Sequence, residues 1–236
     1  MDKTDKILEC ISQIVDLSNR LKKKCYIHGG YVQDIMEGKL LRKHYNIKFF
    51  MEKMDDNINY LIKYLKEKKY YVEYWDYTKI LHLEKNHIRI MLTSIEFIGY
   101  SAIWKYKGEN GFINFPKEWL DKEYRKFYNL EVLTSGIYFE YCYGIFFKYL
   151  HPFWHKDKIE KYIKALDYFE EKIFKNNINI YNLFKQIWSY TPYNYNDGFF
   201  TGYEPPVLVL GKDIVKNHHR TSRLRRKIIE SKKNKK

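Results

Sequence analysis

The chain has 236 residues, of which 45% are hydrophobic and 31% charged, and this balance is typical of a globular protein with a real core. It excludes a disordered or fibrous chain. The three cysteines are odd in number and widely spaced, which excludes a disulfide framework and a cysteine zinc site, so we expect buried free thiols: Cys10, Cys25 and Cys142. The net charge of +14 favours anionic partners.

The amino-terminal part begins with a helix, a strand and a glycine turn. Apolar residues at steps of three or four predict an amphipathic helix over residues 3–23. Residues 25–28 are short and apolar enough for a buried strand. Gly29 and Gly30 then turn the chain into a short helix over residues 31–37.

A second strand is predicted over residues 44–51, where polar and apolar residues alternate. Tyr45, Ile47 and Phe49 point to one side of such a strand, and His44, Asn46 and Lys48 to the other. Because the apolar side packs on the core, we expect the side chains of Asn46 and Lys48 to face a solvent-filled cleft.

The remaining pattern predicts more strands and then helices. A helix is expected over residues 55–68, and strands over 70–75, 80–84, 88–92 and, with weaker patterns, 112–115 and 125–130. Lys85 and Asn86 form a tight turn in a hairpin. Helices are expected over 135–150, 157–175 and 180–190.

These elements predict an α+β fold, a mixed sheet with flanking helices, followed by a helical carboxy-terminal half. We expect an α+β domain at residues 1–132, a helical domain packed on it at 133–191, and a loop with a basic tail at 192–236. The most apolar run, at 136–150, contains Glu140 and Lys148 and is too short to span a bilayer. The amino terminus has acids and no signal-peptide core, so we expect a cytoplasmic protein without a membrane segment.

One motif carries chemistry. An apolar strand is followed by two glycines, an aromatic residue, an acid, a third glycine and an Arg-x-His pair before the next strand. The residues are Gly29, Gly30, Tyr31, Asp34, Gly38, Arg42, His44 and Ile47. In this set and its spacing the chain resembles the aminoglycoside and lincosamide nucleotidyltransferases of the polymerase-β-like superfamily, over roughly residues 1–92 and more loosely the helical half.

The resemblance implies a nucleotidyltransferase-like fold and a site for two magnesium ions and a nucleoside triphosphate. Two ions polarise the α-phosphorus and activate the attacking hydroxyl, and Mg²⁺ prefers carboxylate ligands. In the family pattern three acids supply them. Here those positions correspond to Asn46, Lys48 and, on the later hairpin strand, Arg89. Two cations and an amide would repel the metal or bind it weakly.

We therefore expect a nucleotidyltransferase-fold protein with a degenerate metal site. It would bind a nucleotide or another phosphate-bearing small molecule without two-metal catalysis or a cofactor. The expected binding residues are Gly29, Gly30, Arg42, His44 and Lys48.

Two alternatives stay open. One is an active nucleotidyltransferase that uses Mg²⁺ with a triphosphate and relocated acids, the candidates being Glu52, Asp55, Asp56 and Glu84. The other is a nucleic-acid-binding module that uses the basic tail. The sequence predicts neither the substrate, the base preference nor the oligomeric state.

The tail concentrates the charge. From Lys212 to Lys236 there are eleven Lys and Arg residues against Asp213 and Glu230, a net charge of +9. Few apolar residues accompany them, so we expect this segment to pack poorly. Deleting residues 217–236 should leave the thermal midpoint nearly unchanged and weaken any salt-sensitive binding to a polyanion. A large drop of the midpoint in thermal denaturation would show instead that the tail belongs to the core.

Overall fold

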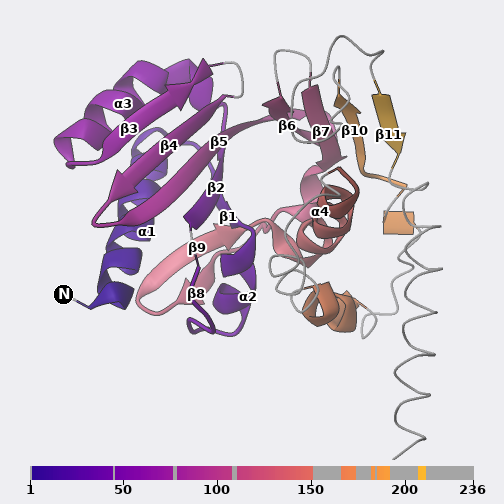
Figure 1. Cartoon of the computed structure of the whole chain (residues 1–236), viewed down its shortest axis with the longest axis horizontal. Helices are drawn as coiled ribbons and strands as arrows, with labels where there is room; N and C mark the ends of the chain where they lie inside the picture. The colour runs from indigo at the N-terminus through magenta and orange to yellow at the C-terminus, as the bar shows by residue number, and fades with distance from the viewer. Residues whose placement is uncertain are drawn as a thin grey trace, which may run out of the picture.

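A computed structural model gives the fold of residues 2–44, 46–76, 79–107, 111–150, 166–173, 182–183, 185–191 and 207–210 (Figure 1). The expected basic tail and most of the loop before it lie outside these described residues. No helix in the described part of the chain combines the length and the apolar character needed to cross a bilayer.

The helices are α1 (Lys3–Arg20), α2 (Gly30–Met36), α3 (Ile58–Glu67) and α4 (Gly136–Leu150), with 3-10 turns η1 (Met54–Asn57) and η3 (Lys117–Trp119) and a further helical segment at residues 166–173. The strands are β1 (Cys25–His28), β2 (Asn46–Glu52), β3 (Tyr71–Trp75), β4 (Ile80–Lys85), β5 (Ile88–Ile98), β6 (Ser101–Lys107), β7 (Gly111–Pro116), β8 (Arg125–Phe127), β9 (Leu130–Thr134), β10 (Trp188–Thr191) and β11 (Val207–Leu210).

All described strands belong to one mixed sheet. Its order is β11-β10-β7-β6-β5-β2-β1-β9-β8, and the β3–β4 hairpin branches off at β5. The pairs β1–β9 and β2–β5 are parallel, and the others are antiparallel. The expected fold class, a central mixed sheet with flanking helices, is confirmed.

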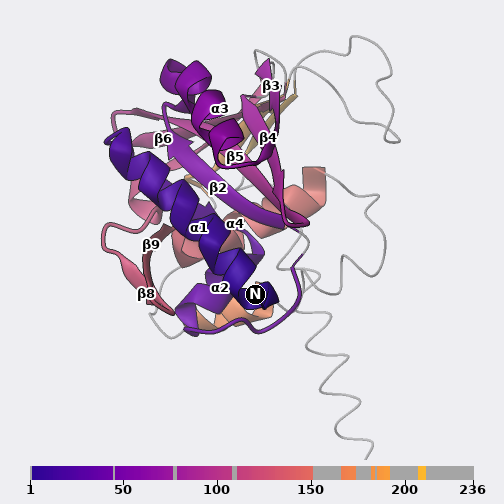
Figure 2. The same cartoon turned by 90° about the vertical axis from the view of Figure 1, so that its left-hand side faces the viewer.

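Helices cover the sheet on both faces. In Figure 2, α1 and α3 lie in front of the strands, and α4 lies behind them. Apolar side chains of α1 and α3 share one core with Ile47 and Phe49 of β2. Phe50 instead belongs to a second core that includes residues of α4.

The alternation along β2 follows from these two cores. Ile47 is fully buried under α1 and α3, whereas Asn46 and Lys48 are half-buried on the opposite face. The register expected from the sequence is therefore the one observed. The outer half of that opposite face, towards β3 and β4, carries exposed side chains such as Tyr71 and Arg89. We call this side of the sheet the cleft face, after the cleft expected from the sequence.

Most local elements match the expected ones, with shifts at their ends. The helix predicted over residues 3–23 ends at Arg20, and its start is fixed by a capping box between Asp2 and Asp5. The hairpin turn lies at Asn86 and His87, one residue later than predicted, because these two residues adopt the positive φ angles of the turn.

Three predictions about strands need correction. The helix predicted over residues 180–190 is wrong at its end, because Trp188–Thr191 forms β10, which pairs with β7 and β11. The single strand predicted over 125–130 is the β8–β9 hairpin, and β6 was not predicted. Helical apolar spacing was outweighed in β10 by hydrogen bonds to strands distant in sequence.

Candidate functional site

The site is built around the turn between β1 and α2, and both glycines are needed there. Gly29 has a φ of +80°, a conformation that other residues rarely adopt, and a Cβ at this position would lie 3.6 Å from Lys48 Cδ. Gly30 is required for space, since its Cβ would lie 2.6 Å from His44 Nδ1. The side chains of Lys48 and His44 thus pack directly on the turn.

Two residues of α2 hold the side chain of His44 in place. Its Nε2 lies 2.7 Å from Asp34 Oδ2, a hydrogen bond in which the imidazole N–H is the donor, and Asp34 is fully buried. The ring also packs on Tyr31, with centroids 4.2 Å apart. Asp34 and Tyr31 therefore orient His44 against Gly30, and Asp34 positions a site residue in addition to bracing its helix.

Arg42 completes the cationic side of the turn. One of its terminal nitrogens, Nη2, would lie 3.6 Å from a Cβ at Gly30. The structure therefore brings together all five residues that the sequence predicted for phosphate binding: Gly29, Gly30, Arg42, His44 and Lys48.

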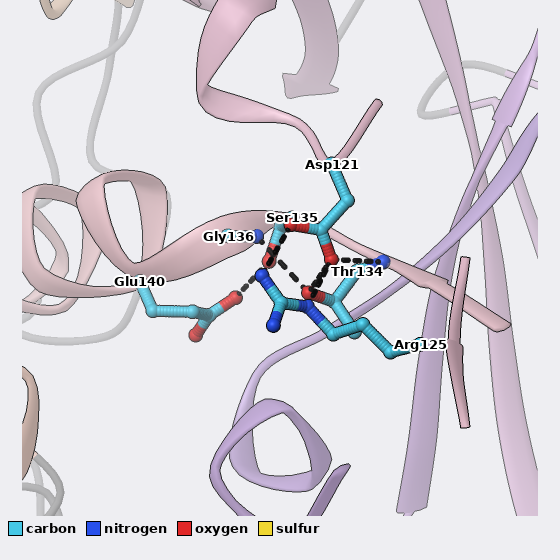
Figure 3. A network of polar contacts seen from close by, with 6 residues as sticks. All are labelled: Asp121, Arg125, Thr134, Ser135, Gly136 and Glu140. Atoms are coloured by element: carbon cyan, nitrogen blue, oxygen red, sulfur yellow. Dashed lines mark hydrogen bonds and ion pairs between the residues drawn. The ribbon is translucent and has the colours of Figure 1, made fainter. Parts of the chain in front are cut away.

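A buried carboxylate, Glu140 of α4, closes the turn from the other side. Its Oε1 accepts the N–H of Gly29 at 2.8 Å and the hydroxyl of Ser135 at 2.5 Å, and the residue is 6% exposed. Figure 3 shows the Glu140 side chain reaching back to Ser135. Sequence reasoning missed this residue, although a single acid near the start of an apolar helix was the available signal.

Burial shifts the pKa values of three neighbouring side chains, those of Glu140, Lys48 and His28. It raises the pKa of Glu140 from 4.5 to about 7, although the hydroxyl of Ser135, the amide of Gly29 and the ammonium of Lys48 all favour the ionised form. Burial lowers the pKa of Lys48, which the charge of Glu140 opposes. It also lowers the pKa of His28 well below its usual value, and Lys48 adds to this, so His28 is neutral.

His28 is buried next to Lys48. The two residues are cross-strand neighbours in β1 and β2. The imidazole stacks on Phe50 with centroids 3.9 Å apart and meets the edges of Trp104 and Phe139. Within the described residues neither ring nitrogen has a hydrogen-bond partner. An apolar, aromatic surround of this kind keeps the imidazole uncharged.

The start of α4 is held by a separate network around Asp121. Its carboxylate accepts two hydrogen bonds from Arg125, at 2.6 and 2.8 Å, and two from the amide and hydroxyl of Thr134, at 3.1 and 2.6 Å. The Thr134 hydroxyl in turn accepts the N–H of Gly136. In Figure 3 this network lies beside Ser135, so it fixes the segment that presents Glu140.

A cavity of about 440 Å³ lies next to this network and is lined by residues including Asp121, Arg125, Gly136 and Tyr138. Neither the Gly29–Gly30 turn nor Lys48 lines it. Its charged lining is mixed, with Lys122 and Arg125 against Glu118, Asp121 and Glu123, whereas Lys48, Arg42 and His44 gather at the turn.

The three positions that the sequence led us to align with the family acids, Asn46, Lys48 and Arg89, lie on the cleft face. Asn46 Nδ2 is 3.3 Å from the sulfur of Met91, and the strand register places Met91 beside Lys48. Arg89 lies beside Asn46, is 76% exposed and pairs with Glu84 at 3.3 Å. An amide, an amine, a thioether and a guanidinium do not form the oxygen-rich ligand set that Mg²⁺ prefers.

The proposed substitute acids are placed unequally. Glu52 shares the cleft face but lies about 13 Å along β2 from Lys48, at about 3.3 Å per residue. Asp55 and Asp56 follow the far end of β2 in η1. Of the four, Glu84 alone lies on the cleft face at the end where Asn46 begins β2. No group of three or more His, Cys, Asp or Glu among the described residues is arranged to hold a metal ion.

Comparison with solved structures identifies the architecture. A solution structure of the antibiotic-resistance factor ANT(2″)-Ia matches with a TM-score of 0.52 and 15% identity, over 75% of this chain and 95% of that one. A crystal structure of ANT(2″)-Ia with adenylyl-2″-tobramycin matches with a TM-score of 0.50 and 14% identity, over 73% of this chain and 99% of that one. The chain has a nucleotidyltransferase fold.

A lincomycin-bound lincosamide adenylyltransferase, LnuA, also matches, with a TM-score of 0.48 and 16% identity over 66% of this chain and 94% of that one. No protein-family model matches the sequence, and no curated protein matches it. The nucleotidyltransferase fold expected from the glycine motif is therefore confirmed by structure, at an identity that supports the fold alone.

The packing of His44 on Gly30 predicts a steric coupling. Replacing Gly30 with Ala should cost about 1–3 kcal/mol of unfolding free energy, because the added Cβ displaces an imidazole that Asp34 holds in place. Combining Gly30→Ala with His44→Ala should cost clearly less than the sum of the two changes, as measured in a double-mutant cycle by urea denaturation. Additive costs would contradict the contact.

Burial of Glu140 predicts a pH-dependent stability. A carboxyl whose pKa rises from 4.5 to about 7 on folding stabilises the protein fully below pH 4.5, and this stability is lost as the pH rises through 7. The difference corresponds to about 3 kcal/mol. The lowered pKa of His28 has the opposite effect, because it reduces the stability as the pH falls below 6.5. This effect is the same in the wild type and in a Glu140→Gln variant, so it cancels when the two are compared.

The measurement is the unfolding free energy of the wild type and of Glu140→Gln between pH 4.5 and 8, by urea denaturation. The variant should gain on the wild type by about 3 kcal/mol over this range, because glutamine does not ionise. A difference that stays constant with pH would contradict the burial of an ionisable Glu140.

Proposed function

We propose that this protein binds a nucleotide, or another phosphate-bearing small molecule, at the Gly29–Gly30 turn without a pair of metal ions. The observation that carries the proposal is the placement of Lys48, whose stem lies against Gly29. The sequence pattern aligns this lysine with a family acid. Lys48, Arg42 and His44 surround one glycine turn, and lysine and arginine bind phosphate oxygens through charge-assisted hydrogen bonds.

The fold supports a nucleotide as the ligand class. ANT(2″)-Ia has been seen with adenylyl-2″-tobramycin, a product that joins an adenylyl group to an antibiotic. In a nucleotidyltransferase fold the turn after the first strand is where we place the phosphates of such a ligand. The antibiotic itself is not part of the proposal, because a fold shared at this identity does not fix the second substrate.

Loss of two-metal catalysis follows from the side chains at the acid positions. Two metal ions would have to be held near Asn46, Lys48 and Arg89, where cations repel them. The cationic side chains would instead neutralise the ligand themselves. Binding of this kind does not require Mg²⁺ and weakens as salt screens the half-exposed charges.

An active enzyme with relocated acids is the second candidate, and one observation favours it. Glu84 lies on the cleft face in the row of Asn46 and Arg89. Its carboxylate is 40% exposed and pairs with Arg89, so it offers one acid where two metals need several. We therefore rank this candidate below metal-independent binding. Nucleic-acid binding by the tail concerns residues outside the described part of the chain.

Titration calorimetry with ATP tests the proposal. We expect similar dissociation constants in EDTA and in excess Mg²⁺, weaker binding at high salt, and no transfer of the nucleotide to small hydroxyl compounds. Lys48→Ala should weaken binding about tenfold or more, the value of a hydrogen bond to a charged group. Lys63→Ala, which removes an exposed lysine from α3 on the other side of the sheet, is the matched control and should bind like the wild type.

Two results would overturn the proposal. Binding that occurs only with Mg²⁺ would show that a metal site exists. Nucleotide transfer that survives Lys48→Ala and is abolished by Glu84→Ala would show that the catalytic acids have moved to β4.

A further inference from the structure

The amide that a phosphate would need at the turn is already engaged. Gly29 donates its N–H to Glu140 Oε1 at 2.8 Å, and the same oxygen accepts the Ser135 hydroxyl. The stem of Lys48 lies on Gly29, and its ammonium interacts electrostatically with Glu140. The carboxylate of Glu140 therefore occupies the N–H of Gly29 and lies near the ammonium of Lys48, the two groups that we propose bind the phosphate.

We propose that Glu140 is an internal competitor for the phosphate ligand, and that the ligand binds when Glu140 takes up one proton. This inference rests on the proposed function, because it concerns the regulation of the same site. The proton comes from solvent and stays on the Glu140 carboxyl. The Gly29 N–H then donates to a phosphate oxygen instead of a carboxylate, and no covalent bond changes.

The competition follows from charge. With Glu140 ionised, its negative charge balances Lys48 and would repel an arriving phosphate at short range in a buried setting. With Glu140 neutral, the positive charge of Lys48 is uncompensated, and a protonated carboxyl accepts a hydrogen bond less strongly than a carboxylate. Because burial raises the pKa of Glu140 to about 7, either state is accessible near neutral pH.

Lys48 is the charged side chain that acts on the pKa of Glu140. Lys48 lies on β2, and the N–H of Gly29 donates to Glu140 from the end of β1. His28, which precedes Gly29, is kept neutral by burial. Further charged groups lie on elements that share a contact or a core with α4. Asp34 of α2 pairs with His44, Lys105 of β6 pairs with Glu96 of β5, and Lys172 of the helical segment 166–173 pairs with Glu37. Lys117 and Glu118 of η3 are exposed, and Glu52 lies at the far end of β2.

The experiment compares ATP binding to the wild type and to Glu140→Gln in EDTA, by calorimetry from pH 6 to pH 8.5. Glutamine has the shape of the protonated acid and keeps an acceptor for Gly29 and Ser135. The wild type should lose about tenfold in affinity relative to the variant between pH 6 and pH 8, as a single proton with a pKa near 7 requires. Because both proteins meet the same ligand, the ratio cancels the titration of ATP itself.

Proton uptake gives a second readout. At pH 8 the wild type should take up close to one more proton than Glu140→Gln on binding ATP, measured from the binding heat in buffers of different ionisation enthalpy. Glu131→Gln, which removes an exposed acid from β9, is the matched control and should keep the pH dependence of the wild type.

A measurement on the ligand-free wild type guards against a variant that fails to fold. The amide resonance of Gly29 should move with a midpoint near pH 7, because its acceptor changes from carboxylate to carboxyl. A Gly29 resonance that does not move between pH 5.5 and pH 8.5 would overturn the inference.

The remaining outcomes separate the two proposals. ATP affinities whose ratio stays constant across the pH range would overturn the proton coupling and leave the phosphate site in place. Absence of ATP binding in both proteins at every pH would overturn the proposed function, and the coupling with it.

Discussion

The hydrogen bond from Gly29 to Glu140 joins two parts of the chain that are 111 residues apart, and the site depends on it. It ties the end of β1, where the glycine turn begins, to the first turns of α4. The carboxylate is 6% exposed, and its donors come from the turn and from Ser135. Since a buried carboxylate without donors would be strongly destabilising, the turn and the helix stabilise each other's position.

A buried ionisable cluster of this kind is not explained by stability alone. Well-packed hydrophobic residues in place of a buried ion pair are often neutral or stabilising. Here Lys48, Glu140 and His28 have pKa values displaced mainly by burial, beside an otherwise apolar aromatic core. Groups with such displaced pKa values gather at functional sites, and the Gly29–Gly30 turn lies among them.

One fold can carry sites of different chemistry. The nucleotidyltransferase architecture brings the start of β2, the turn after β1 and the neighbouring β5 side by side in the sheet. What this part of the sheet can bind depends on a few side chains, which in this chain include Asn46, Met91 and Arg89. The same fold is therefore compatible with anion binding in place of metal-assisted transfer.

The sequence by itself determined the features that depend on local period and on backbone conformation. The alternation along residues 44–51 predicted the cleft-facing side of β2, and the glycines at 29 and 30 predicted the turn on which Lys48 and His44 pack. Only the tertiary structure decided the rest: that Glu140 binds Gly29, that Met91 rather than Arg89 lies beside Lys48, and that Trp188–Thr191 is a strand. Each of these depends on strand register or on contacts between distant segments, which a local pattern does not encode.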